Sequence, residues 1–164
     1  MRYILAIFSI AIVLTELTGC AGTLFSYRGK VVAEPKNRFA FKEGDQQAIW
    51  DTGDLALNYR YQKSADSLKI SGTVELSSGM LTNFSTAKYL DINLLFLDKQ
   101  GTVIQNMLLF SAGDHYEFTS VRPSFEKTIP VPDGSDSFSF AYNGVLMDGK
   151  TMSTEEFTVG YFPK

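Results

Sequence analysis

An alternation of apolar and mostly polar residues runs through residues 55–62 (LALNYRYQ), and it limits the possible folds more than any other feature of this chain. The odd positions hold Leu, Leu, Tyr and Tyr, whereas the even positions hold Ala, Asn, Arg and Gln. Because successive side chains on a β-strand point to opposite faces, this pattern predicts a strand with one buried face and one solvent-exposed face.

The same two-residue alternation of apolar and polar residues continues along the chain. Residues 67–77 (SLKISGTVELS) are predicted to form the partner strand, with Gly72 marking a bulge or a close approach of another backbone. In residues 89–97 (YLDINLLFL), Leu95 and Leu97 add a second apolar face, so this strand is expected to be covered on both sides. Further strands are expected at residues 102–110, 125–129, 137–143 and 156–161.

No window shows the spacing of an amphipathic helix, and residues 80–90 are expected to hold one short turn at most. Short strands separated by turns predict an all-β fold: a single antiparallel two-sheet β-sandwich, immunoglobulin-like or transthyretin-like, with a small closed barrel as the alternative. The stretch PVPDGSDSFSFAYNG, residues 130–144, resembles the loop and late strand of many bacterial immunoglobulin-like modules.

The N-terminal 20 residues have the layout of an export signal. Arg2 precedes an apolar run of 11 residues at 4–14 (ILAIFSIAIVL), which is too short for a permanent membrane span. Leu17, Thr18, Gly19 and Cys20 then resemble the lipobox of bacterial lipoproteins, in which a peptidase cuts before a lipid-modified cysteine. We therefore expect a signal peptide at 1–19, lipidated Cys20 and a linker at 20–30, and the β-sandwich domain at 31–164. Two alternatives are cleavage after Ala21, giving a soluble exported protein, and an uncleaved anchor.

The resemblance also implies a location. Lipoproteins of two-membrane bacteria that carry aspartate after the cysteine tend to stay in the inner membrane, and this chain has Ala21 there. An outer-membrane lipoprotein facing the periplasm is therefore expected if the organism has two membranes. Cys20 is the only cysteine, so the domain must be stable without an intramolecular disulfide. The net charge of −3 comes from scattered residues, which argues against a nucleic acid partner.

Three places in the sequence are candidates for chemistry. His115 is the only histidine and lies in a polar stretch predicted to be a solvated loop, without a nucleophile motif nearby. Asp133 and Asp136 in DGSD could approach a calcium ion, but Asp-Gly pairs are also ordinary turn residues. Asp51 and Asp54 after Trp50 could form a sugar site with an aromatic platform, although a single Trp is more often part of a core.

These observations favour a non-catalytic protein with no cofactor and no metal. We expect a lipid-anchored binding or structural module of the cell envelope, attached to the membrane through Cys20 and contacting an envelope protein or glycan. An accessory or pilot subunit of a secretion or transport complex is the first alternative. An envelope hydrolase is the second, and the lack of a catalytic motif disfavours it.

Overall fold

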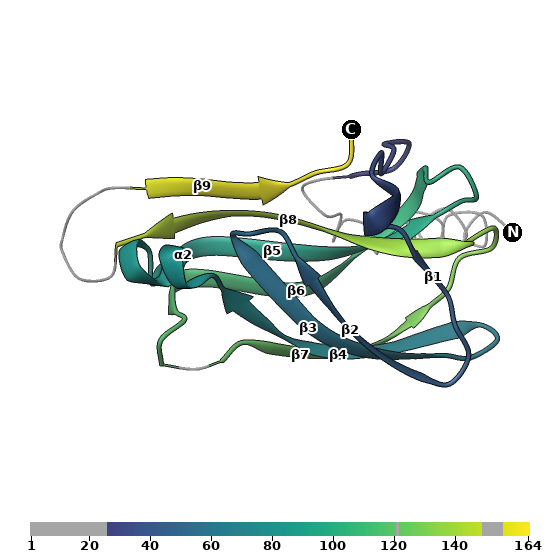
Figure 1. Ribbon diagram of the computed structural model, residues 1–164, viewed down its shortest axis with the longest axis horizontal. Helices are drawn as coiled ribbons and strands as arrows, with labels where there is room; N and C mark the ends of the chain where they lie inside the picture. The colour runs from purple at the N-terminus through teal and green to yellow at the C-terminus, as the bar shows by residue number, and fades with distance from the viewer. Residues whose placement is uncertain (1–25, 121, 149–155) are drawn as a thin grey trace, which may run out of the picture.

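The computed structural model describes residues 26–120, 122–148 and 156–164, which form two antiparallel β-sheets (Figure 1). The five-stranded sheet contains β1 (Phe39–Ala40), β5 (Thr86–Leu97), β6 (Val103–Glu117), β8 (Ser137–Met147) and β9 (Glu156–Tyr161). The four-stranded sheet contains β2 (Asp45–Asp51), β3 (Leu55–Lys63), β4 (Ser67–Leu76) and β7 (Ser124–Pro130). A 3-10 turn, η1 (Pro35–Asn37), precedes β1, and the short helix α2 (Ser78–Asn83) joins β4 to β5.

The strand order is β1-β8-β5-β6 in the larger sheet and β2-β3-β4-β7 in the smaller one. Strands β1 and β9 pair with different parts of the same edge of β8, because β5 occupies its other edge. The two sheets pack face to face and do not close on each other. The two-sheet β-sandwich is therefore confirmed, and the closed-barrel alternative is wrong.

The predicted strands agree well with the observed ones where alternation is strict. Strands β3, β4 and β9 match their expected ranges within a residue. Strand β6 runs on to Glu117, beyond the expected end at residue 110. Strand β2 was not predicted, because Ile49 is 65% exposed on its outer face and only Trp50 on its inner face is fully buried. An edge strand with only one buried residue does not need apolar residues at every second position, so its alternation in the sequence is weak.

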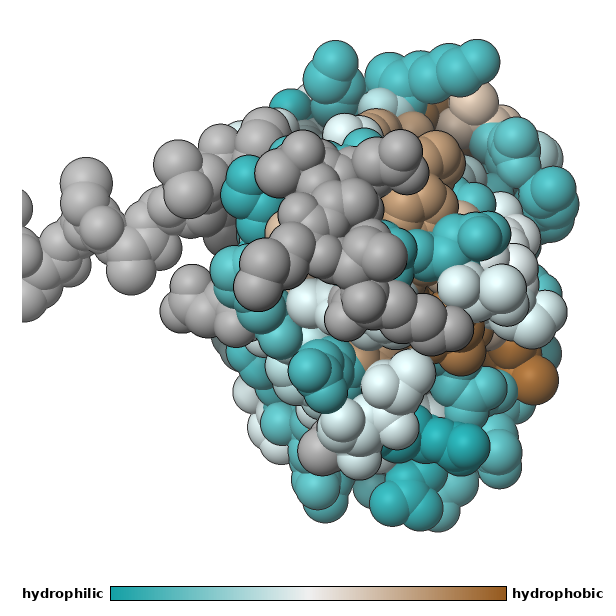
Figure 2. Space-filling view, turned by 90° about the vertical axis from the view of Figure 1, so that its left-hand side faces the viewer, coloured by the Kyte–Doolittle hydropathy of each residue, from teal (hydrophilic) through white to brown (hydrophobic). Residues whose placement is uncertain are grey.

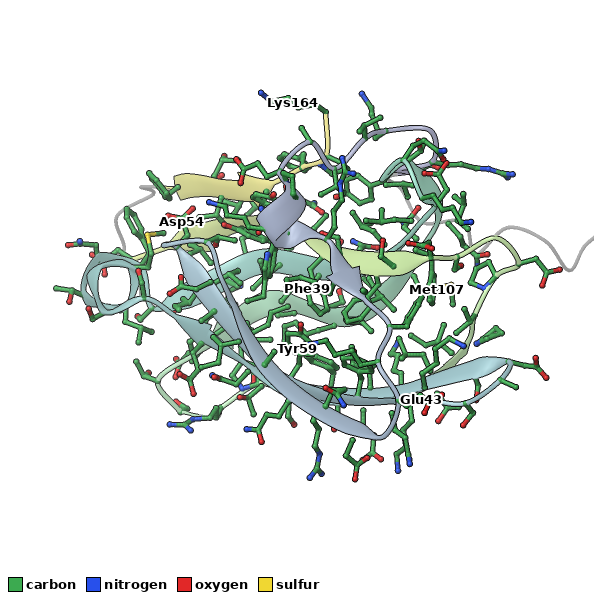
Figure 3. All side chains as sticks on the ribbon, turned by 45° about the vertical axis from the view of Figure 1, so that its right-hand side comes forward. Phe39, Glu43, Asp54, Tyr59, Met107 and Lys164 are labelled. Atoms are coloured by element: carbon green, nitrogen blue, oxygen red, sulfur yellow. The ribbon has the colours of Figure 1, made fainter. Side chains whose placement is uncertain are left out.

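An aromatic core fills the space between the sheets. Tyr59 from β3 packs edge-to-face on Phe140 from β8 at 4.9 Å between ring centroids, and Tyr61 packs on Phe138 at 5.1 Å. Phe39 of β1 contacts three of these rings, and Figure 3 shows it pointing with Tyr59 into the layer between the sheets. The abundant aromatic residues are therefore mainly core residues, as the alternation predicts.

The N-terminal segment covers the outer face of the five-stranded sheet. Tyr27 and Val32 pack there against Leu95 and Leu97 of β5 and Ala141 of β8. The second apolar face predicted for β5 is thus confirmed. Tyr27 belongs to the stretch expected as linker, yet its side chain is only 5% exposed. The packed domain consequently includes residues before position 31.

The two ends of the described chain meet on this same side. Val31 donates its backbone N–H to the carbonyl of Lys164 at 2.7 Å, and Lys164 donates back to Val31 at 3.0 Å. Figure 1 shows the C-terminus next to the earliest described segment, with the four-stranded sheet on the opposite side of the sandwich. The outer face of the four-stranded sheet therefore lies away from both ends.

Gly72 marks a close approach of two strands, one of its two predicted roles. The register of β3 with β4 continues through Gly72 without a bulge. A Cβ atom at this position would lie 2.5 Å from the backbone oxygen of Asn58 and 3.0 Å from the ring of Phe125. The position has room for glycine alone.

Strand β7 forms an edge of its sheet. One of its residues on the side facing the other sheet is a lysine. Lys127 lies between the buried Phe125 and Ile129, and its Nζ donates to the backbone oxygen of Leu108 in β6 at 2.9 Å. The strand ends in Pro130. An inward lysine and a terminal proline both discourage another chain from adding to this edge.

Candidate functional site

Trp50 is a core residue, the interpretation that the sequence favours, and the alternative of a sugar platform is excluded. Trp50 is 2% exposed and packs against the rings of Phe140, Tyr142 and Tyr161 at 5.2–6.0 Å between centroids. Its ring therefore offers no platform at the surface. Asp51 accepts a hydrogen bond from the backbone N–H of Gly53 at 2.8 Å, as expected in a tight turn.

Asp54 instead belongs to a hydrogen-bonded group at one end of the core. The hydroxyl of Tyr142 donates to the Asp54 carboxylate at 3.2 Å and lies 3.0 Å from the hydroxyl of Thr52. Asp54 lies in the turn between β2 and β3 (Figure 3). Burial raises the pKa of Tyr142 to about 12; the Thr52 hydrogen bond lowers this pKa, and the Asp54 carboxylate raises it.

We expect the protein to lose stability as the pH rises from about 10 to about 12, because the folded state holds Tyr142 neutral while the unfolded state ionises near the ordinary tyrosine pKa of 10.0. The contribution is fully present below pH 10.0 and disappears as the pH passes the folded-state pKa. Urea unfolding at a series of alkaline pH values would measure it. Tyr142→Phe should make the decline shallower, and an unchanged slope would contradict the assignment.

His115 is exposed, as predicted, but the predicted loop is wrong because the residue lies in β6. The pairing of β5 with β6 shifts register between Ala87 and Tyr89, and His115 lies within the resulting bulge with a positive φ of 66°. This left-handed backbone conformation is uncommon for non-glycine residues but less so for histidine.

Asp133 and Asp136 lie in the turn between β7 and β8. Gly134 has a φ of 81°, the Ser135 hydroxyl donates to the Pro132 carbonyl at 2.6 Å, and Asp136 donates its N–H to Leu97. These bonds account for the turn without an ion. Within residues 26–120, 122–148 and 156–164, no three His, Cys, Asp or Glu residues lie close enough to hold a metal. The predicted lipidation residue, Cys20, lies outside the described residues.

The outer face of the four-stranded sheet carries an extended set of polar side chains, and we call it the polar face. Its side chains form rows across the strands, because directly paired residues lie side by side. One row is Gln47, Arg60, Ser71 and Glu126; the next is Ile49, Asn58, Thr73 and Ser124. A third row contains Asp45, Gln62, Lys69 and Thr128.

Two adjoining hollows mark this face. The larger has a volume of about 460 Å³, and its polar lining includes Gln47, Asn58, Arg60, Ser71, Thr73 and Glu126. The second, of about 380 Å³, extends toward the row of Asp45, Gln62 and Lys69. Short side chains at Asn58, Ser71 and Thr73 form the floor of the larger hollow, whereas the longer Arg60 and Glu126 border it. A polar, mixed-charge depression of this kind suits a ligand rich in hydrogen-bonding groups.

Exposed apolar surface is limited to separate positions. Within the described part of the chain, the large apolar side chains with substantial exposure are Val31, Ile49, Tyr89, Phe157 and Phe162. Figure 2 shows brown patches separated by hydrophilic residues at the end of the molecule that carries α2, and a mostly hydrophilic lower part. Ile49 alone of these residues belongs to the polar face. Apolar burial is therefore a minor source of binding energy there.

Comparison with known protein families, curated proteins and solved structures finds no match. Arg60, Asn58, Ser71 and Thr73 were not singled out from the sequence as site residues. Their signal was nevertheless present, because they occupy the polar half of the alternation in β3 and β4. Among the described residues, no helix combines the length and the apolar character needed to cross a membrane.

Proposed function

We propose that this protein is a lipid-anchored, non-catalytic component of the cell envelope that binds another envelope component through its polar face. The observation that carries this proposal is the arrangement of the sandwich. The N-terminal segment packs on the outside of one sheet, and the hollowed polar face is the outside of the other. A chain attached to a membrane by its N-terminus would present this face away from the membrane.

The resemblance of residues 17–20 to a lipobox supplies the anchor in this proposal. Cys20 is six positions before Ser26, the first described residue, and six extended residues reach about 20 Å. The domain would thus remain close to the membrane surface. Two or more acyl chains on one cysteine would hold it stably, whereas a single chain binds only marginally. Ala21 after the cysteine favours the outer membrane in an organism with two membranes.

The first experiment tests the anchor. Cells grown with labelled palmitate should label the wild-type protein, and Cys20→Ser should abolish the label and release the protein from the membrane fraction, because the acylated sulfur is removed. Ser26→Ala is a matched control outside the lipobox and should retain the label. Equal labelling of the wild type and Cys20→Ser, or no label on either, would refute lipid anchoring at this residue.

Crosslinking in cells tests the binding surface separately. A photo-crosslinking amino acid at Gln47 on the polar face should capture a specific envelope component, whereas the same group at Lys99, an exposed turn residue of the other sheet, should not. Equal capture at both positions would contradict the assignment of the surface.

An accessory or pilot subunit of an envelope complex is the second candidate. Ile49, which is 65% exposed on edge strand β2, favours it, because an exposed apolar side chain on a free edge suits a protein partner. A single protein crosslinked through Gln47 would support this candidate, and a glycan crosslink would support a glycan-binding module.

A further inference from the structure

Arg60 is the cation of the polar face that has no ion-pair partner in the part of the chain that the structure describes. Its Nε donates to the hydroxyl of Ser71, its paired neighbour on β4, at 3.1 Å. The second basic residue of the polar face is Lys69. Its Nζ lies 3.0 Å from the carboxylate of Glu126. The terminal nitrogens of Arg60 are therefore available for a carboxylate, which arginine can bind through two parallel hydrogen bonds.

The nearest acidic residue in the same row does not cancel this charge. Glu126 accepts its hydrogen bond from Lys69, and this bond, with the charges of Lys69 and Arg60, holds the pKa of Glu126 below its usual value. Glu126 is thus ionised and already paired at neutral pH. With Glu126 paired to Lys69 of the neighbouring row, Arg60 is the unpaired cation of its own row among the described residues. The other acid of these three rows, Asp45, lies in the row of Lys69 beside the second hollow.

The floor beside Arg60 offers hydroxyl and amide groups. The side chains of Asn58, Thr73 and Ser124 lie in one row, and no hydrogen bond within the described residues uses them. Adjacent strands are about 4.8 Å apart, so these three polar side chains on three strands span about 10 Å, and the fourth member of the row is the apolar Ile49. This repeat of donors and acceptors matches a polymer that carries hydroxyl groups at short, regular intervals.

We propose that the larger hollow binds an acidic polysaccharide, with Arg60 pairing a carboxylate of one sugar and Asn58, Ser71 and Thr73 hydrogen-bonding the hydroxyl groups of its neighbours. This assignment rests on the proposed function of the polar face and adds the chemical class of the ligand. Burying such side chains without partners is costly, so an extended ligand that satisfies them is favoured over one that only covers them.

The composition of the hollow disfavours a peptide as its main ligand. Protein interfaces obtain most of their binding energy from buried aromatic, arginine and aliphatic anchors in well-packed pockets. Tyr59 and Phe125 border the hollow, but they are 2% and 7% exposed and already belong to the core. Ile49 is the single large apolar side chain exposed on this face. A ligand rich in hydroxyl groups makes better use of the remaining surface.

Calorimetric titration of the full-length lipidated protein in detergent tests the proposal. Polygalacturonate is the probe, with neutral dextran and polyglutamate as comparison polymers. We expect polygalacturonate to bind best and binding to weaken as salt is added. Arg60→Ala should weaken binding at least about tenfold, because a charge-assisted hydrogen-bond pair is lost. Arg60→Lys should weaken it less, and the exposed control Lys99→Ala should leave it unchanged.

The other outcomes would overturn the proposal in distinguishable ways. Equal losses for Arg60→Ala and Lys99→Ala would show unspecific charge attraction, and dextran binding as tightly as polygalacturonate would remove the role of the carboxylate. Tighter binding of polyglutamate would indicate an acidic peptide. No binding of any polymer would refute the ligand class, whereas specific capture through Gln47 in cells would still support the proposed function of the face. Thermal unfolding of each Arg60 variant confirms that the fold is retained.

Discussion

Replacing Phe140 with alanine is expected to lower the free energy of unfolding by about 3–5 kcal/mol, the usual cost of removing a fully buried aromatic ring. Phe140 is 0% exposed and lies at the centre of the inter-sheet layer. Its ring contacts four others: Phe39, Trp50, Tyr59 and Phe138. These rings come from both sheets, so the cavity could close only if the sheets moved together.

Urea unfolding followed by circular dichroism would measure this loss. Phe162→Ala is a suitable control, because Phe162 is 52% exposed and should cost much less. Similar losses for the two variants, or a loss below about 1 kcal/mol for Phe140→Ala, would contradict the packing described for the core.

Gly72→Ala is expected to destabilise the protein by about 1–3 kcal/mol, although alanine is normally the better residue in a strand. The added Cβ would lie 2.5 Å from the backbone oxygen of Asn58, and a backbone atom within a paired strand cannot rotate away. The same substitution should also disturb the floor of the polar face, because Asn58 belongs to it.

Gly113→Ala provides the matched control in β6, where an added Cβ would meet no atom within 4 Å. Its stability should equal or exceed that of the wild type. Chemical denaturation of both variants measures the difference. If Gly72→Ala were as stable as Gly113→Ala, the close approach of β3 and β4 at Gly72 would be refuted.

Strands with one well-covered face could be predicted, because burial of that face requires apolar residues at every second position of the sequence. Strands β3 and β4 are of this kind, whereas β8 was predicted from its alternating aromatic residues although both of its faces are buried. The order of strands within each sheet could not be predicted. It depends on pairings between residues far apart in the sequence, such as Phe39 with Phe138, and alternation contains no information about which strand lies alongside. Strand β2 was missed because its outer face carries Ile49 and its inner face is incompletely buried.

The candidate site was harder to predict than the fold. Trp50, Asp51 and Asp54 form a conspicuous cluster in the sequence, but folding buries the ring, uses Asp51 in a local turn hydrogen bond and pairs Asp54 with the distant Tyr142. Arg60 and Thr73 are inconspicuous, since each is an ordinary polar residue of a half-buried strand. Their proximity arises from the register between β3 and β4, which places Arg60 opposite Ser71 and Asn58 opposite Thr73. A binding surface built by register has no motif in the linear sequence.

The pairing of Val31 with Lys164 has a practical consequence for work in living cells. A fluorescent reporter or affinity tag fused after Lys164 would emerge beside the N-terminal segment, on the side nearest the proposed anchor. The polar face on the opposite sheet would remain unobstructed. A tag inserted between β3 and β4, at residues 64–66, would instead border the face itself. C-terminal fusions are therefore the appropriate reporters for this protein, and insertions at the β3–β4 turn can serve as deliberate blockers of ligand access.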